Sequence, residues 1–130
     1  MIDVPDTHRD LLESSVASLA TIGPDGRPQL TVVWFLYDND EVALSLNVTR
    51  QKTKNLVARP QCSLLILDPG VPERYLEIRG DVEVTPDDGS FIEKVGKKYH
   101  TDLRAYDAPN DERVVVRIVP TRVNAVDMRG

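Results

Sequence analysis

The stretch QLTVVWFLYDNDEVALSL, residues 29–46, carries the strongest local fold signal in the chain. Its first nine residues are mainly β-branched, aromatic or leucine, which strands prefer. The sequence DND at residues 38–40 is typical of a tight turn, and residues 42–46 then form a second apolar run. An earlier run, residues 16–22, leads into this stretch through the turn sequence GPDG at 23–26. We therefore predict an antiparallel meander of three strands joined by two short turns.

Working outward, the flanking sequence predicts three short helices and three further strands. Thr49 and Pro60 bracket one helix, and Thr85 opens another as an N-cap that is followed by proline and acidic residues. Pro120 is a candidate break in the last strand. The helices are expected at residues 5–13, 49–58 and 85–99, and the additional strands at 62–67, 75–84 and 114–126. The sequence thus predicts a mainly β fold, a six-stranded antiparallel barrel in one domain spanning residues 1–130.

Composition narrows the class of protein. The chain has 130 residues, 41% of them hydrophobic and 28% charged, which is the balance of one soluble domain. No apolar run is long enough to cross a bilayer, so we expect no membrane association. A net charge of -5 argues against non-specific nucleic-acid binding. The lone Cys62 excludes an internal disulfide and fits a reducing, cytoplasmic location.

A cationic segment stands out against this acidic background. Residues 47–60, NVTRQKTKNLVARP, contain Arg50, Lys52, Lys54 and Arg59 and no acidic residue. Two of these cations fall in the first turn of the predicted helix, where free backbone N–H groups and the helix dipole also attract anions. The segment therefore predicts a site for a small phosphorylated ligand. A solvated basic face is the alternative that the residue types leave open.

Two strands lie close to this segment in sequence. Residues 29–35 precede it, and residues 44–46 lead directly into the basic helix. A flat ring attached to the bound anion could extend along these strands, with Thr31 and backbone groups at its polar edge and Val33 against its face. Trp34 is either a further ring contact or a core residue.

Other candidate sites are weaker. The chain has no GxGxxG or P-loop sequence, and His8 and His100 show no ligand spacing, so no metal site is predicted. His100 closes a predicted helix, where a cation suits the dipole. Cys62 lies in the run QCSLLIL and is expected to be a buried hydrophobic residue rather than a nucleophile.

The order of these segments resembles a known family. The hairpin, the TVVWF strand, LSLN, the block RQKTKNL and the run ARPQCSLLIL resemble the pyridoxamine-phosphate-oxidase-like split β-barrel flavoproteins, and in particular the small actinobacterial branch that uses the deazaflavin coenzyme F420. The later stretches YLEIRGDVEVTPD and VVVRIVPTRV also fit. The resemblance implies an FMN-binding-like split barrel that forms a homodimer, with two cofactor sites across the subunit boundary.

The resemblance also implies which residues bind the cofactor. Thr31, Val32, Val33 and Trp34 would lie along the ring system; Ser45, Leu46 and Asn47 would approach the linker; Thr49, Arg50, Gln51 and Lys52 would hold the phosphate; and Lys54 and Asn55 would sit at the pocket edge. No catalytic side chain is implied, because the cofactor carries the hydride chemistry.

The activity implied is that of an F420-dependent oxidoreductase. Hydride would pass from the reduced deazaflavin to a small conjugated acceptor such as an enone, a quinone or a tetrapyrrole. FMN also carries a phosphate, so an FMN-dependent oxidoreductase of the same fold is the alternative cofactor assignment. A non-catalytic flavin- or haem-binding carrier or sensor is the alternative from another functional class.

Overall fold

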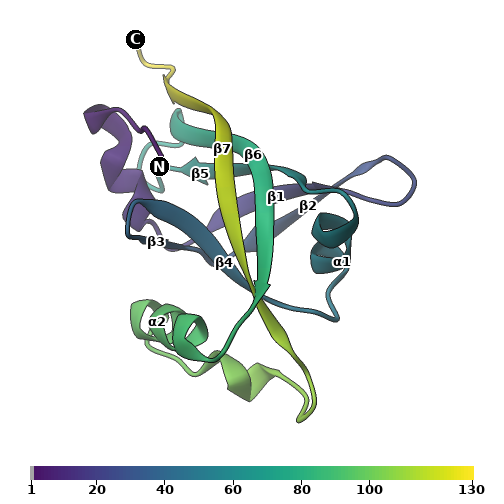
Figure 1. The fold of residues 1–130 in the computed structure, drawn as a ribbon. Coiled ribbons are helices and arrows are strands. Elements are labelled where there is room, and N and C mark those ends of the chain that lie inside the picture. The colour runs from purple at the N-terminus through teal and green to yellow at the C-terminus, as the bar shows by residue number, and fades with distance from the viewer. Residues whose placement is uncertain (1) are drawn as a thin grey trace.

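A single antiparallel sheet curls into a barrel in the computed structural model, which describes residues 2–130 (Figure 1). In chain order the elements are the 3-10 segment η1 (Asp6–Glu13), β1 (Ala17–Ile22), β2 (Pro28–Val33), β3 (Leu36–Asp38), β4 (Glu41–Asn47), α1 (Gln51–Ala58), β5 (Gln61–Leu67), β6 (Arg74–Pro86), α2 (Ser90–Tyr99), the 3-10 segment η2 (Leu103–Tyr106) and β7 (Arg113–Asp127). The strand order is β2-β1-β5-β6-β7-β4-β3, so the predicted mainly β barrel is confirmed. The described chain has seven strands rather than six.

The prediction of a three-stranded meander is wrong. β1 pairs with β2 and β3 pairs with β4, but β2 and β3 are at opposite ends of the strand order. The long apolar run is interrupted at Trp34 and Phe35, where the chain crosses from one end of the sheet to the other. Both halves of the run are apolar and extended, so composition could not reveal this crossing.

The hydrophobic core fills the interior of the barrel. Alternate residues of β1 are buried, as expected for a strand with one face toward the core. Phe35 is completely buried at the crossing between β2 and β3. Other apolar side chains with no exposed surface come from five strands and comprise Leu19, Leu44, Leu64, Ile66, Leu76, Ile78 and Val116. The core therefore joins elements that are distant in sequence.

The start of α2 differs from the sequence expectation. Thr85 and Pro86 end β6 instead of opening a helix, because the β6–β7 ladder continues to their partners. The Asp87 carboxylate then accepts hydrogen bonds from the N–H groups of Gly89, Phe91 and Ile92. Asp87 therefore caps the start of α2, where a negative charge interacts favourably with the helix dipole.

β7 runs through Pro120 without ending. The pairing register shifts opposite Pro120, between Arg79 and Gly80. A Cβ atom on Gly80 would lie 2.2 Å from the Val119 carbonyl oxygen, so only glycine allows the two strands to approach there. The long β6–β7 pair accommodates proline by a local irregularity.

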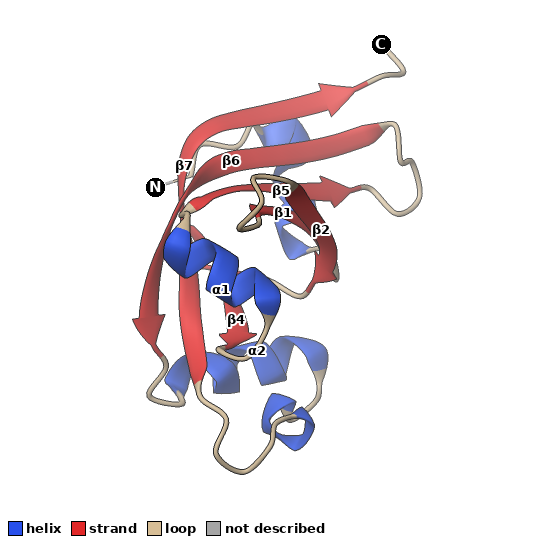
Figure 2. Cartoon of the chain, turned by 90° about the vertical axis from the view of Figure 1, so that its right-hand side faces the viewer, coloured by secondary structure: helices blue, strands red, loops and turns tan. Residues whose placement is uncertain are grey.

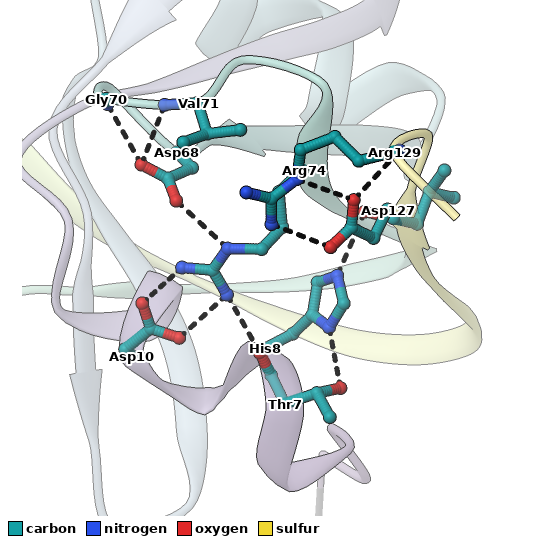
Figure 3. Close-up of polar contacts among 10 residues, drawn as sticks. Thr7, His8, Asp10, Asp68, Gly70, Val71, Arg74, Asp127 and Arg129 are labelled. Atoms are coloured by element: carbon teal, nitrogen blue, oxygen red, sulfur yellow. Dashed lines mark hydrogen bonds and ion pairs between the residues drawn. The ribbon is translucent and has the colours of Figure 1, made fainter.

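η1 closes one end of the barrel. Its Leu11 and Leu12 are buried, and Arg74 at the start of β6 binds the Asp10 and Asp68 carboxylates and the Thr7 carbonyl (Figure 3). His8 donates from Nε2 to the Val126 carbonyl at 3.0 Å when its Nδ1 accepts from Thr7. No helix within residues 2–130 has the length and apolar character needed to cross a membrane.

Candidate functional site

The cationic segment, residues 47–60, runs from the last residue of β4 through the whole of α1 to the residue before β5. Figure 2 shows α1 in front of the barrel, between the β1–β2 hairpin and β4. Helix α1 begins at Gln51 rather than Thr49, and Arg50 occupies the N-cap position without a side-chain capping bond. Thr49 lies before the helix, where its hydroxyl donates to Asn47 Oδ1 at 2.7 Å. The first N–H groups of α1 are therefore left without a side-chain cap.

Asn47 holds this turn in place. Its Oδ1 accepts from the Thr49 N–H and hydroxyl, and its Nδ2 donates to Asp107 and Asp111, at 3.1 and 2.9 Å. The Asn47 carbonyl accepts from the Thr53 hydroxyl at 2.7 Å. All side-chain hydrogen-bonding positions of Asn47 are filled, so its observed role is to fix the approach to α1.

The cations at the start of α1 have no acidic partner. Among the described residues no carboxylate lies within 4.0 Å of the charged groups of Arg50, Lys52 or Lys54. The first turn of α1 also contains no acidic residue. Partial burial, with the nearby Arg50 charge, lowers the pKa of Lys52. A bound anion would relieve this repulsion and satisfy the free N–H groups.

An amide network connects α1 to the β1–β2 hairpin. Asn55 is completely buried; it accepts from Gln51 Nε2 at 2.8 Å and donates to Thr21 and Gln29 at 3.1 and 3.2 Å. A groove of about 450 Å³ opens above this network, between the hairpin turn and α1. Its lining is Gly23, Pro24, Asp25, Arg27, Pro28, Gln29, Gln51 and Asn55. Asn55 and Gln51 thus fix the wall of a groove that begins at the helix N-terminus.

Thr31 provides a polar group without a partner. Its Oγ1 is buried and makes no hydrogen bond within the described structure. A buried hydroxyl without a partner is costly, so such a group is a candidate ligand contact. In the described part of the chain β2 pairs only with β1, which leaves alternate backbone N–H and C=O groups free along its other edge. The polar edge of a ring could form hydrogen bonds with the Thr31 hydroxyl and with these free backbone groups of β2.

The other expected site residues fall into three groups. Val33 and Leu46 belong to the hydrophobic core, so they could contact a cofactor through backbone atoms. Ser45 lies beside Arg113, whose guanidinium forms an ion pair with Asp107. The residues that remain exposed or half-exposed are Val32, Trp34, Thr49, Arg50, Gln51, Lys52 and Lys54.

Trp34 has a partner that sequence reasoning missed. Its ring stacks on the Tyr99 ring with centroids 4.1 Å apart and planes 4° from parallel. Lys98, the preceding residue of α2, lies 4.0 Å from the centre of the Phe35 ring, and burial lowers its pKa. Trp34 is still 38% exposed, so it is neither an ordinary core residue nor a free surface side chain. Nothing local in the sequence indicates Tyr99 as the partner of Trp34, because 65 positions separate the two residues.

These residues fit a phosphorylated ring cofactor. The N-terminus of α1 with Arg50 and Lys52 can hold a phosphate, and Thr31 with the free edge of β2 can hold the polar edge of a ring. The same features would suit the phosphate of F420 or of FMN. Cys62 contributes no nucleophile, because burial raises the pKa of its thiol to about 11.

Fold and geometry together define a split-barrel protein in which β2 is an edge strand and the N-terminus of α1 is cationic. The chain belongs to the pyridoxamine 5'-phosphate oxidase family, whose model matches residues 4–127. A solved structure named F420 reductase is 36% identical, with a TM-score of 0.81; the match covers 93% of this chain and 98% of that one.

Two further solved structures show how broadly this fold is used. A conserved hypothetical protein from Mycobacterium tuberculosis is 29% identical over 99% of this chain and 88% of its own, with a TM-score of 0.79. The haem storage protein HutZ from Vibrio cholerae is 14% identical over 96% of each chain, with a TM-score of 0.77. At that identity the likeness to HutZ concerns the fold alone.

Proposed function

We propose that this chain is an F420-dependent oxidoreductase that reduces a small conjugated acceptor. The observation that carries the proposal is the unpaired cationic N-terminus of α1, formed by Arg50 and Lys52, together with the unpartnered Thr31 hydroxyl on β2. The similarity to the solved F420 reductase supports the deazaflavin over FMN. Lys54, which is exposed on the same helix, adds positive charge that suits the carboxylate-rich tail of F420.

The residues of the chain bind and orient the cofactor. Arg50, Lys52 and the first N–H groups of α1 hold the phosphate through charge-assisted hydrogen bonds. Thr31 and the free edge of β2 fix the rotation of the ring, and core residues behind β2 keep water from that side. Reduced F420 supplies the hydride when bound. Acceptor specificity then depends on what reaches the open face of the ring.

We also propose that the chain works as a homodimer. Directly opposed residues in the sheet share a face, so Val32, Ser18 and Leu65 lie in one row on the outside of β2, β1 and β5. Leu30, which is 71% exposed, lies in the next row with Ala20. This apolar, uncharged surface is self-complementary in chemistry and lies on the other side of the strand that carries Thr31. A second copy seated there would place the ring sites at the subunit boundary.

The cofactor assignment is tested by titrating the purified protein with F420 and with FMN in parallel by calorimetry. We expect F420 to bind more tightly, and the double variant R50A/K52A to bind it at least about tenfold more weakly, because each charge-assisted bond contributes roughly 1.5–3 kcal/mol. The matched control K94A/K97A removes two cations from α2 and should leave the affinity unchanged. Equal F420 affinity in R50A/K52A would remove the site assignment.

Turnover separates the enzyme from a carrier. Reduced F420 with an enone or quinone acceptor should be oxidised by the wild type and more slowly by R50A/K52A at subsaturating cofactor. Tight F420 binding without turnover of any enone, quinone or tetrapyrrole acceptor would favour a binding or sensing protein. Tighter binding of FMN than of F420 would favour the flavin enzyme.

A further inference from the structure

Two side chains in the last turn of α2 form hydrogen bonds with the backbone at both ends of the β1–β2 hairpin. Tyr99 Oη accepts a hydrogen bond from the Phe35 N–H at 3.1 Å. The same oxygen lies 2.6 Å from the Ser15 carbonyl oxygen and 3.1 Å from the Phe35 carbonyl oxygen, and its single proton can be donated to either one. Lys98 Nζ donates to the carbonyls of Ser14 and Phe35, both at 2.8 Å. Ser14 and Ser15 enter the hairpin, and Phe35 leaves it. Two adjacent side chains therefore bind both strand ends at once.

These contacts replace a missing strand pairing. Phe35 is fully buried between β2 and β3, which are not paired, so its backbone N–H and C=O lack strand partners. Buried backbone groups need hydrogen bonds, and here side chains from residues 98 and 99 provide them. The Lys98 ammonium also lies over the Phe35 ring, which adds a cation–π contact. The crossing between β2 and β3 is thus held by α2.

The same turn of α2 orients Trp34. The near-parallel Tyr99 ring covers one face of the indole at 4.1 Å, next to the backbone contacts at Phe35. Trp34 follows directly after Val33, the last residue of β2, and Thr31 lies three residues earlier. Fixing Trp34 and Phe35 therefore fixes the end of the strand along which the ring is proposed to bind.

We infer that Lys98 and Tyr99 are positioning residues for the ring-binding strand, acting through Trp34 and Phe35. The inference rests on the proposed function, because it assigns α2 a role at the same cofactor site. The phosphate end of that site is built separately, from α1 and Asn47. The two ends should therefore respond independently to substitution.

Two probes separate these ends: F420 itself, and the deazaflavin–ribitol fragment that lacks the phosphate. Tyr99→Leu removes the stack and the hydroxyl contacts, and should weaken both probes by the same factor, about fivefold or more. Tyr99→Phe keeps the stack and should have a smaller effect; Lys98→Met should weaken both probes as well. R50A/K52A should weaken F420 while leaving the fragment within about twofold of wild type.

The protein contains one tryptophan, so its emission reports directly on Trp34. Tyr99→Leu should shift this emission in the ligand-free protein, whereas Lys97→Ala, an exposed neighbour on α2, should change neither the emission nor either affinity. Should Tyr99→Leu and Lys98→Met fold, shift the emission and still bind both probes like wild type, the inference is overturned while the proposed function stands. Wild type that binds F420 but not the fragment also overturns the inference. Wild type that binds neither probe overturns the proposed function itself.

Discussion

The Thr31 hydroxyl is buried at a cost that the ligand-free protein does not recover. It has no hydrogen-bond partner, and a buried polar group in that state typically costs about 1–3 kcal/mol. We therefore predict that Thr31→Val leaves the free energy of unfolding unchanged or raises it. The same substitution should weaken F420 binding by about fivefold, because a hydrogen bond to the ring edge is lost.

Thr53→Val is the matched control for this prediction. The Thr53 hydroxyl is also buried, but it donates to the Asn47 carbonyl at 2.7 Å. Its loss should lower the free energy of unfolding by about 1 kcal/mol. Chemical denaturation measures both variants, and calorimetry measures F420 affinity. Equal destabilisation by the two substitutions would show that Thr31 has a partner in solution; unchanged F420 affinity in Thr31→Val would exclude it from the ring site.

Some roles of individual residues could be predicted from the sequence, and others could not. The cluster around Arg50 and Lys52 could be predicted because its charges lie within a few residues of one another and no acid interrupts them. The structural role of Asn47 could not, since its partners Asp107 and Asp111 are 60 and 64 positions away. The same holds for Tyr99, which binds Phe35 from 64 positions away.

At the element scale, Arg74 connects η1 to the start of β6. This side chain is largely buried and pairs with Asp10 and Asp68, and its hydrogen bonds hold the pKa of each carboxyl below its ordinary value of 3.8 (Figure 3). A carboxyl with a lowered folded pKa stabilises the fold above its unfolded pKa and loses that contribution as the pH falls through the folded value. The attachment of η1 should therefore weaken below about pH 4.

We predict that Arg74→Met lowers the midpoint of thermal unfolding at pH 7 by several degrees. Arg129→Met is the matched control, because its Asp127 ion pair lies two residues away and is half exposed, where such pairs contribute little. The difference between Arg74→Met and wild type should shrink as the pH falls from 3.8 toward the lowered pKa values of the folded protein, because both wild-type carboxyls become protonated over that range. A difference that stays constant with pH would assign the effect to packing alone.

Most elements could be predicted, but the pairing of two strands and the start of one helix could not. Local periodicity identifies the strand segments. It does not show that β3 pairs only with β4, because that pairing depends on how the chain turns at Phe35. The helix start was placed too early because the sequence Thr-Pro-Asp-Asp satisfies capping preferences. The pairing of Pro86 with Val114 keeps this segment in β6 instead. Tertiary pairing thus overrides a local signal.

At the scale of the whole molecule, charge is distributed unevenly. The protein carries a net charge of -5, yet the start of α1 is cationic and the outer face of β2, β1 and β5 is apolar and uncharged. On β6 that face ends at the ion pair of Glu77 with Arg79. An acidic molecule with one apolar face bounded by charges is suited to pair with itself through that face, since charge repulsion is smallest there.

We predict that Leu30→Asp converts a dimer into a monomer. A charge on that face would be buried without a partner in a symmetric interface, and it would meet its own copy or face an apolar neighbour. Sedimentation velocity should show wild type at twice the mass of Leu30→Asp. Val119→Asp is the matched control, because it introduces the same charge at an exposed apolar residue of β7 outside this face, and this variant should remain a dimer. A wild type that sediments as a monomer at micromolar concentration would contradict the homodimer, and F420 affinity equal in wild type and Leu30→Asp would show that each site is complete within one chain.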